Sequence, residues 1–194
     1  MSDHTMNRIQ RSSEHTAMPW ANGGGITFEV ASSPAGADFT SFNWRISMAE
    51  VRESGPFSTF SGVDRVLTVL GPGDLTLLIN DNEVLSRRHE PRHFSGDDDV
   101  RAELVDGPIT DLNVMTRRGR CTGVVTVQTI DGVVNLEPQS QSNTVVVVLA
   151  GTLDLVDGEG LSVRDVLFLH DNTTIMGNAT IARIDITDLG DTRG

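Results

Sequence analysis

The chain has 194 residues, a formal net charge of −12 at pH 7 and one cysteine. This length accommodates one compact domain with a sizeable core, or two small β-units fused into one body. The charge argues against nucleic acid and anionic membranes as partners, because both are bound through basic patches, and a single cysteine excludes an intrachain disulfide and a cysteine-based metal cluster.

The basic residues are all arginine, since the chain contains 15 of them and no lysine. A phosphate-binding P-loop requires a lysine, so that nucleotide-binding motif is excluded. Guanidinium groups grip carboxylates and phosphates through two parallel hydrogen bonds, which makes arginine the expected contact for a bound anion.

The sequence predicts neither export nor membrane insertion. Residues 1–17 are polar and lack the apolar run of a secretory signal. The longest apolar run, 145–150, is far too short to span a bilayer. We therefore expect a soluble cytoplasmic protein without a membrane partner.

The first predicted element is a glycine-rich corner in the segment 20–29. Residues 23–25 are consecutive glycines, which lack a Cβ and therefore adopt positive φ or admit a ligand close to the backbone. A strand after them places Thr27 and Glu29 on one face, because side chains alternate along a strand. The segment predicts a polar binding site; the alternative is a plain β-corner with Trp20 in the core.

Period-two alternation predicts a strand over 42–49 and a hairpin further along the chain. In 42–49 the large apolar residues alternate with Asn43, Arg45, Ser47 and Ala49, which is typical of a half-buried strand. The runs 66–70 and 75–79 flank Gly-Pro-Gly-Asp, which indicates a hairpin with a tight turn.

The remainder of the chain also favours strands. Residues 100–105 precede an Asp-Gly-Pro turn signal. Further candidates rich in β-branched residues are 122–130, 144–150, 153–156, 163–169 and 180–187. No window of a dozen residues has helical apolar spacing, so the chain is predicted to be an all-β sandwich or barrel.

A short internal repeat suggests two β-units. Residues 66–77 resemble 145–155, since each is an apolar strand, a glycine turn and a second alternating strand. The similarity is either a duplication or a property shared by many hairpins. A duplication implies two tightly packed β-barrels with a break near 119–132, where the composition is not that of a linker.

The second polar constellation is a strip on the strand predicted over 111–117. Asp111, Asn113, Met115 and Arg117 share one face, so a carboxylate, an amide and a guanidinium lie two residues apart. The strip suits a small polar molecule; the alternative is a solvated outer face with a neutralising Asp-Arg pair.

Together these segments resemble the HutD/Ves family over residues 8 to 185. The motifs that carry the resemblance are Trp-Ala-Asn-Gly-Gly-Gly-Ile-Thr-Phe-Glu at 20–29, and the segments 44–51, 55–65, 94–97, 111–115 and 118–119. The resemblance implies a double cupin (bicupin) of two jelly-roll barrels, here predicted as 1–120 and 121–194. It also implies a gene commonly found beside histidine-utilisation enzymes, and a protein that modulates that pathway by sensing a small metabolite. The acidic C-terminal third departs from the family, so the resemblance does not decide whether the second barrel has a pocket of its own.

The histidines do not predict a metal site or another cofactor. A metal-binding cupin places two histidines two residues apart on a strand, with a glutamate and a third histidine downstream, and this pattern is absent from the sequence. The segment 89–93 has histidines four apart, but Pro91 interrupts the helix that a zinc-binding pair of this spacing needs. We predict no metal and no cofactor.

The binding site is therefore expected in the N-terminal barrel. The ligand implied by the pathway is a small anionic metabolite, urocanate-, formate- or formylglutamate-like. One wall would comprise Asn22 and the amides of Gly23, Gly24 and Gly25, with Thr27 and Glu29 beside them and Asp111 and Asn113 on the facing strand. Arg45 or His93 would supply the positive charge.

Two other functions remain possible on the sequence. A cupin isomerase or hydrolase acting on a small carboxylic acid would use Glu29 and Asp111 as acid and base. A structural interaction protein would make no use of the glycine corner. A homodimer is expected in each case, because open barrels leave sheet edges to be covered.

Overall fold

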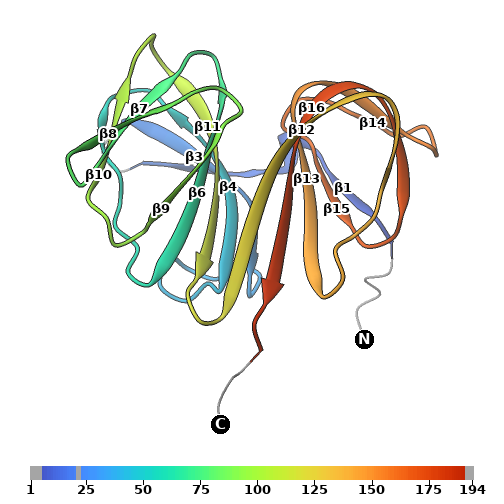
Figure 1. The fold of residues 1–194 in the computed structure, drawn as a ribbon, viewed down its shortest axis with the longest axis horizontal. Coiled ribbons are helices and arrows are strands. Elements are labelled where there is room, and N and C mark those ends of the chain that lie inside the picture. The colour runs from blue at the N-terminus through green and yellow to red at the C-terminus, as the bar shows by residue number, and fades with distance from the viewer. Residues whose placement is uncertain (1–5, 21–22, 191–194) are drawn as a thin grey trace. The chain divides into compact units, whose positions relative to one another are not determined.

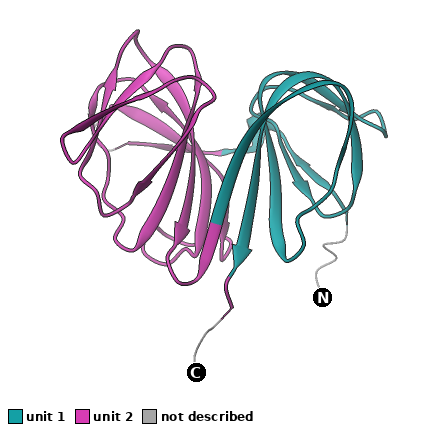
Figure 2. Ribbon diagram, in the orientation of Figure 1, with its two compact units in different colours: residues 1–15, 123–188 teal, residues 16–122, 189–194 magenta. Residues whose placement is uncertain are grey.

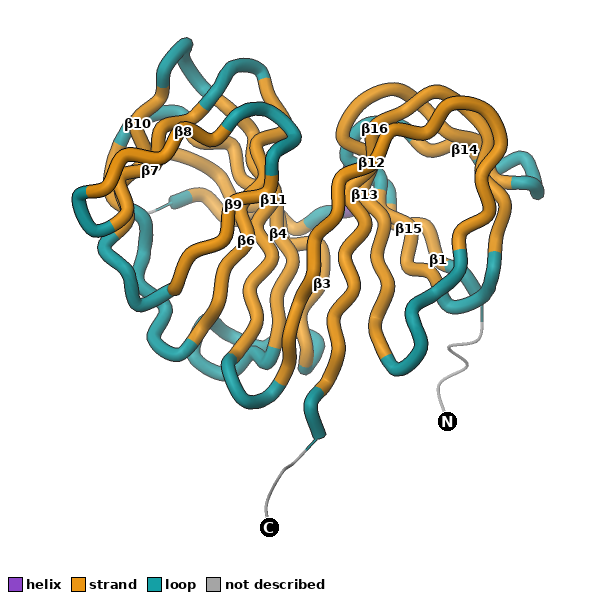
Figure 3. The backbone as a smooth tube through the Cα atoms, viewed as in Figure 1, coloured by secondary structure: helices purple, strands orange, loops and turns teal. Residues whose placement is uncertain are grey.

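The computed structural model describes residues 6–20 and 23–190. Strands and their connecting turns account for almost all of these residues (Figures 1 and 3). The chain divides into two compact units (Figure 2). The N-terminal barrel comprises 16–122 with the end of the chain from 189, and the C-terminal barrel comprises 1–15 with 123–188. Within the described residues, no helix is long and apolar enough to cross a membrane.

The all-β prediction is confirmed. The strands of the N-terminal barrel are β2 (Thr16–Pro19), β3 (Gly25–Ser33), β4 (Trp44–Val51), β5 (Gly55–Pro56), β6 (Val63–Gly71), β7 (Leu75–Ile79), β8 (Asn82–Ser86), β9 (Pro91–Ser95), β10 (Val100–Leu104) and β11 (Ile109–Arg117). The others are β1 (Arg8–Gln10), β12 (Cys121–Leu136), β13 (Ser142–Leu155), β14 (Gly160–Leu161), β15 (Val166–Leu169) and β16 (Thr173–Asp188), with a 3-10 turn, η1 (Ser12–Glu14).

Two facing sheets build the N-terminal barrel. One has the order β2-β3-β4-β11-β6-β9 and the other β5-β10-β7-β8. Their inner faces share a core of aliphatic residues and one phenylalanine, which includes Val51, Leu67, Val69, Leu75, Leu77, Phe94, Val100 and Ala102. This apolar packing fills one end of the space between the sheets and leaves polar residues on the inner face at the other end.

Two local predictions for this barrel are wrong. Strand 42–49 is buried on both faces: Arg45, Ser47 and Ala49 are enclosed, because they lie on the inner face of a closed barrel. The predicted hairpin over 66–79 does not form, since β6 and β7 belong to different sheets. Gly71, at a φ of 120°, ends β6 where the chain crosses to the facing sheet.

The C-terminal barrel is a single sheet with the order β1-β15-β13-β16-β12, from which β14 branches off β13. The pairing of β13 with β16 shifts register between Val148 and Ala150, where β13 has a bulge. Gly151 follows with a φ of 78°, and a Cβ there would collide with the backbone of β16. The interior is packed with aliphatic side chains of β12, β13, β15 and β16. The described interior of this barrel is therefore a hydrophobic core.

The division of the chain differs from the predicted halves at the N-terminal end. β1 pairs antiparallel with β15, with Ile9 opposite Leu167. Residues up to 15 consequently belong to the C-terminal barrel. The backbone amide of Ser12 and the guanidinium of Arg11 both hydrogen-bond to Asp165, which fastens this segment to that barrel.

Candidate functional site

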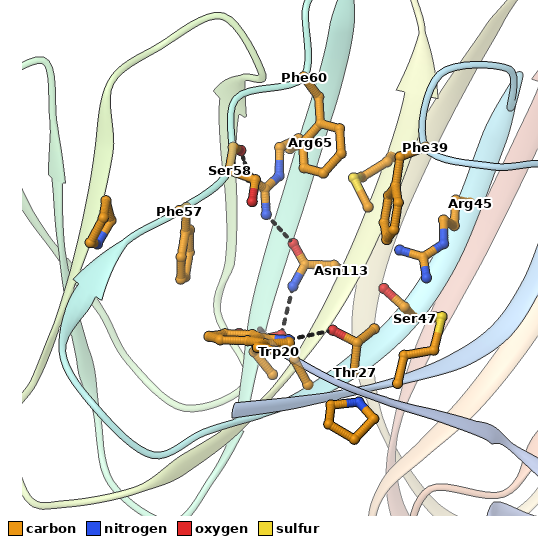
Figure 4. A pocket seen from close by; sticks show the side chains of 16 residues that line it. Trp20, Thr27, Phe39, Arg45, Ser47, Phe57, Ser58, Phe60, Arg65 and Asn113 are labelled. Carbon is orange, nitrogen blue, oxygen red and sulfur yellow. Dashed lines mark hydrogen bonds between the residues drawn. The ribbon is translucent and has the colours of Figure 1, made fainter. Parts of the chain in front are cut away.

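A cavity of about 460 Å³ opens on the polar end of the N-terminal barrel's inner face (Figure 4). This volume falls within the range of about 300–1,000 Å³ that is usual for small-ligand pockets. Its walls combine aromatic, hydroxyl, amide and charged side chains. The lining residues are Met18, Pro19, Trp20, Thr27, Phe39, Arg45, Ser47, Ala49, Pro56, Phe57, Ser58, Phe60, Arg65, Asp111, Asn113 and Met115.

The floor of the cavity is a grid of cross-strand rows on β4, β11 and β6. Met115 pairs with Arg45 on one side and with Arg65 on the other. Because neighbouring strands are about 4.8 Å apart, the Cα atoms of these two arginines are separated by about 10 Å. In the next row Asn113 lies between Ser47 and Leu67. The strand register thus places Arg45 and Arg65 on either side of Met115, with Asn113 in the adjacent row.

Arg65 is the most deeply held charge in the site. Its side chain is 6% exposed and is surrounded by the rings of Phe57, Phe60 and Phe94, with the guanidinium carbon 4.9 to 5.4 Å from their centroids. Nη2 donates to the Asn113 side-chain oxygen at 2.9 Å, and Nη1 donates to the Ser58 carbonyl at 3.3 Å. Burial lowers the pKa of Arg65 to about 10, so it is a cation at neutral pH whose hydrogen bonds go to neutral acceptors.

Asp111 lies one row beyond Asn113 and is 1% exposed. The Asn113 amide nitrogen donates to Asp111 Oδ1 at 2.6 Å while its oxygen accepts from Arg65, which fixes the orientation of the amide. Burial raises the pKa of Asp111 to about 7, although the charge of Arg65 and the hydrogen bond from Asn113 act to lower it. The cavity therefore contains a carboxyl group that titrates near neutrality.

Arg45 forms the second cationic wall. It is 3% exposed, and its Nε donates to Glu29 Oε2 at 2.7 Å. The ring of Phe39 covers the guanidinium, with the ring centroid 4.6 Å from its central carbon. Nη2 is buried without a hydrogen-bond partner among the described residues. Figure 4 shows this group facing the cavity from the side opposite Arg65.

Two loops supply the aromatic walls. Backbone hydrogen bonds from Phe57 to the Val100 carbonyl, at 2.8 Å, and from Phe60 to the Gly96 carbonyl, at 2.7 Å, hold the loop before β6. Arg117, the last residue of β11, donates to the carbonyls of Thr40 and Phe42 and so fastens the loop that carries Phe39. The rings of Phe39 and Phe60 then lie 5.9 Å apart between their centroids.

The glycine corner acts on the site through Trp20. Gly23 has a φ of 75°, and hydrogen bonds between Trp20 and residues 23 and 25 close the turn that joins β2 to β3. A Cβ on Gly25 would lie 2.5 Å from the Glu50 carbonyl oxygen and 3.0 Å from the indole. The turn places the indole over the cavity, where its Nε1 donates to Thr27 Oγ1 at 2.8 Å.

The structure brings together some of the predicted site residues and separates others. Thr27, Arg45, Asp111 and Asn113 line the cavity, and Glu29 holds Arg45. Gly23, Gly24 and Gly25 form the turn behind Trp20 and do not belong to the lining, whereas Asn22 lies outside the described residues. His93 is exposed on β9, with its neighbour Phe94 buried, so it lies away from the cavity.

Sequence reasoning missed Arg65 and the aromatic walls. Arg65 alternates with Val63, Leu67 and Val69, which are all buried. A charged residue in step with buried apolar positions is a signal for an enclosed polar site. In the sequence, the segment 55–65 is marked only by the family resemblance. Its phenylalanines lie in a loop, where periodicity does not predict the direction of the side chains.

Metal ligation has little support in the described part of the chain. There, no group of three or more His, Cys, Asp or Glu side chains is placed to hold a metal ion. The cavity is lined by two guanidinium groups, an amide, an indole and one buried carboxyl group, and guanidinium groups bind anions.

The fold and the cavity define the class of protein: it is a double cupin with a pocket in the N-terminal barrel. A cupin 2 conserved barrel domain protein from Leptotrichia buccalis shares the fold, with a TM-score of 0.57 at 12% identity over 84% of this chain and 89% of its own. The family profile HutD matches residues 12–184, and the chain belongs to the HutD family.

Several relatives place the chain more closely. An uncharacterized 21.2 kDa protein in the hutC 3′ region of Pseudomonas putida is 33% identical over 182 residues, 92% of each chain. HutD from Pseudomonas fluorescens SBW25, solved in a formate condition, has a TM-score of 0.79 at 31% identity, covering 95% of this chain and 100% of that one. Protein Ves of Cronobacter sakazakii is 44% identical over 56% of this chain, and the chain spans 59% of the length of that relative.

Proposed function

We propose that the N-terminal barrel binds a small carboxylate metabolite, and that the protein is a non-enzymatic sensor that modulates histidine catabolism. The observation that carries the proposal is Arg65, a buried cation whose hydrogen bonds go to a neutral amide and a carbonyl. Its Nε is buried without a partner among the described residues. A buried charge is costly unless it is paired and hydrogen-bonded. The nearby carboxyl of Asp111 reaches Arg65 only through the Asn113 amide, so a carboxylate in the cavity would supply the direct contact.

The second arginine supports a ligand with two polar ends. Arg45 is already paired with Glu29, so it needs only a partial charge or a neutral acceptor for its free Nη2. The walls of Trp20, Phe39 and Phe57 favour a flat or conjugated middle part. Urocanate has both the two polar ends and a conjugated middle part. N-formylglutamate has the two polar ends on a flexible aliphatic chain, and formate fits the Arg65 end alone.

The comparisons support a ligand from histidine degradation. The chain belongs to the HutD family, and its relative in Pseudomonas putida is encoded in the hutC region. The related HutD of Pseudomonas fluorescens was solved in a formate condition, which makes formate a reasonable first probe.

Calorimetric titration tests the proposal. Formate, urocanate and N-formylglutamate would be titrated into the wild type, Arg65→Gln, Asn113→Ala and the matched control Arg101→Gln, which changes an exposed arginine on β10. We expect a loss of about ten- to hundredfold for Arg65→Gln, because one hydrogen bond to a charged ligand contributes about 1.5–3 kcal/mol. Asn113→Ala should also weaken binding, because Asn113 holds the guanidinium of Arg65. Unchanged binding by folded Arg65→Gln, or no binding by the wild type, would contradict the proposal.

One observation favours an enzyme as the second candidate. A general acid or base works best with a pKa near the operating pH, and the pKa of the enclosed Asp111 is about 7. Incubation of the three acids with the protein, followed by proton NMR, distinguishes the two functions. Turnover that is lost in Asp111→Asn would replace the sensor with an isomerase or hydrolase.

A further inference from the structure

Asp111 is held apart from the nearest cation by a neutral group. Its Oδ1 accepts the hydrogen bond from Asn113, and it is the other end of this amide that accepts from Arg65. The register places Ala49 and Val69 on either side of Asp111, with Thr27 one strand further. The facing sheet contributes Leu75, Leu77 and Ala102 to the same core. Asp111 therefore lies in an apolar setting in which Arg65 is the charge that acts on it.

The charges around the cavity balance before any ligand enters. Arg45 and Glu29 form one ion pair, and ionised Asp111 offsets Arg65 through the amide. A carboxylate bound at Arg65 would add one negative charge to this enclosed space, where charges are poorly screened. Glu29 is already paired with Arg45, at 2.7 Å between Oε2 and Nε. Asp111 is the remaining carboxyl group that can restore neutrality.

We propose that the cavity takes up its carboxylate together with one proton, and that Asp111 is the residue that carries this proton. The inference rests on the proposed function. A bound anion at Arg65 both adds negative charge near Asp111 and engages the guanidinium that stabilises the aspartate. Both effects favour the neutral acid. Burial already raises the pKa of Asp111 to about 7, so little further change is needed for protonation at neutral pH.

Linkage gives the sign of the pH dependence. Where free Asp111 is protonated, below about pH 7, the ligand binds without net proton uptake. Above that pH each binding event must first protonate Asp111, so the affinity falls by up to about tenfold per pH unit until the pKa of the complex is reached. The affinity for an anion should therefore fall by up to about a hundredfold between pH 7 and pH 9.

Calorimetry in two buffers of different ionisation enthalpy counts the protons. Formate is the primary probe because it is a monoanion throughout pH 6–9, and N-formylglutamate, which has two ionised carboxylates over the same range, is a second one. We expect the wild type to take up close to one proton per ligand at pH 8, and Asp111→Asn to take up none with an affinity that does not vary with pH. The matched control Glu103→Gln removes an exposed carboxyl on β10 and should behave as the wild type. His93→Gln should also retain the uptake.

The outcomes separate the two proposals. Failure of the wild type to bind either acid at any pH contradicts the proposed function. Binding with a flat pH profile and no proton uptake contradicts this inference alone, as does uptake that persists in Asp111→Asn or disappears in His93→Gln. The wild-type measurement needs no variant, and an infrared band of a protonated carboxyl that appears on binding provides an independent reading should Asp111→Asn fail to fold.

Discussion

The stability of the N-terminal barrel should fall as the pH rises, because Asp111 is buried without a cation in contact. In the folded state burial raises the pKa of Asp111 from 3.8 to about 7. Between these values the folded protein binds more protons than the unfolded chain, so the free energy of unfolding decreases with increasing pH. Asp111→Asn replaces the titrating oxygen with an amide of similar shape, and its carbonyl oxygen can still accept the hydrogen bond from Asn113.

The size of the effect follows from the same linkage. Each pH unit between pH 4 and pH 7 contributes about 1.4 kcal/mol, so the variant should gain up to about 4 kcal/mol over the wild type by pH 8. Below pH 4 the two proteins should be nearly equal in stability. Both tryptophans, Trp20 and Trp44, belong to the N-terminal barrel, so urea unfolding followed by tryptophan fluorescence reports on this barrel. A difference between variant and wild type that stays constant from pH 4 to pH 8 would refute the reasoning.

Three further predictions concern the turn, the C-terminal barrel and assembly. Gly25→Ala should destabilise by several kcal/mol more than Gly55→Ala in urea unfolding, because its Cβ would lie 2.5 Å from a carbonyl oxygen whereas that of Gly55 meets open space; equal stabilities would contradict this. Burial raises the pKa of Asp165, but the hydrogen bonds from Ser162, Ser12 and Arg11 outweigh burial and hold the pKa below its usual value. The contribution of ionised Asp165 to the free energy of unfolding is therefore present above about pH 4 and is lost as the pH falls. Asp165→Asn should therefore lower the free energy of unfolding by about 1–3 kcal/mol at pH 7 and by less at pH 3, as measured by urea unfolding followed by circular dichroism. A loss of stability that does not depend on pH would contradict this prediction. Light scattering should show a homodimer, and a monomer at all concentrations would exclude it.

The presence of the strands and the polar strip on β11 could be predicted from the sequence because residues alternate between the two faces of a strand. Asp111 and Asn113 share a face with Met115 whatever the tertiary structure, and a closed barrel turns this face inward. The inward orientation of Arg45 could not be predicted in this way, because on β4 the large apolar residues Trp44 and Ile46 lie on the opposite face and mark that face as the expected core face. Alternation predicts which residues share a face, but the closure of the sheet decides which face is the inner one.

Arg65 shows why the remainder of the site could not be predicted. Arg65 shares a face with the apolar residues Val63, Leu67 and Val69, so periodicity can place it on an inner face, but periodicity does not identify what Arg65 contacts there. Its partners Phe57, Phe94 and Asn113 come from a loop and two other strands. The glycine corner was a similar case, because Gly25 leaves space for the Trp20 indole and for the carbonyl of Glu50 on β4, and these neighbours are known only from the tertiary structure.

A crystal structure of the protein grown with N-formylglutamate tests the central claim most directly. We predict a carboxylate of the ligand within about 3 Å of the Arg65 guanidinium, which lines the cavity, with the other end directed towards Arg45. A saturating ligand found at another surface, or a cavity that holds only water at concentrations at which calorimetry shows binding, would contradict the account.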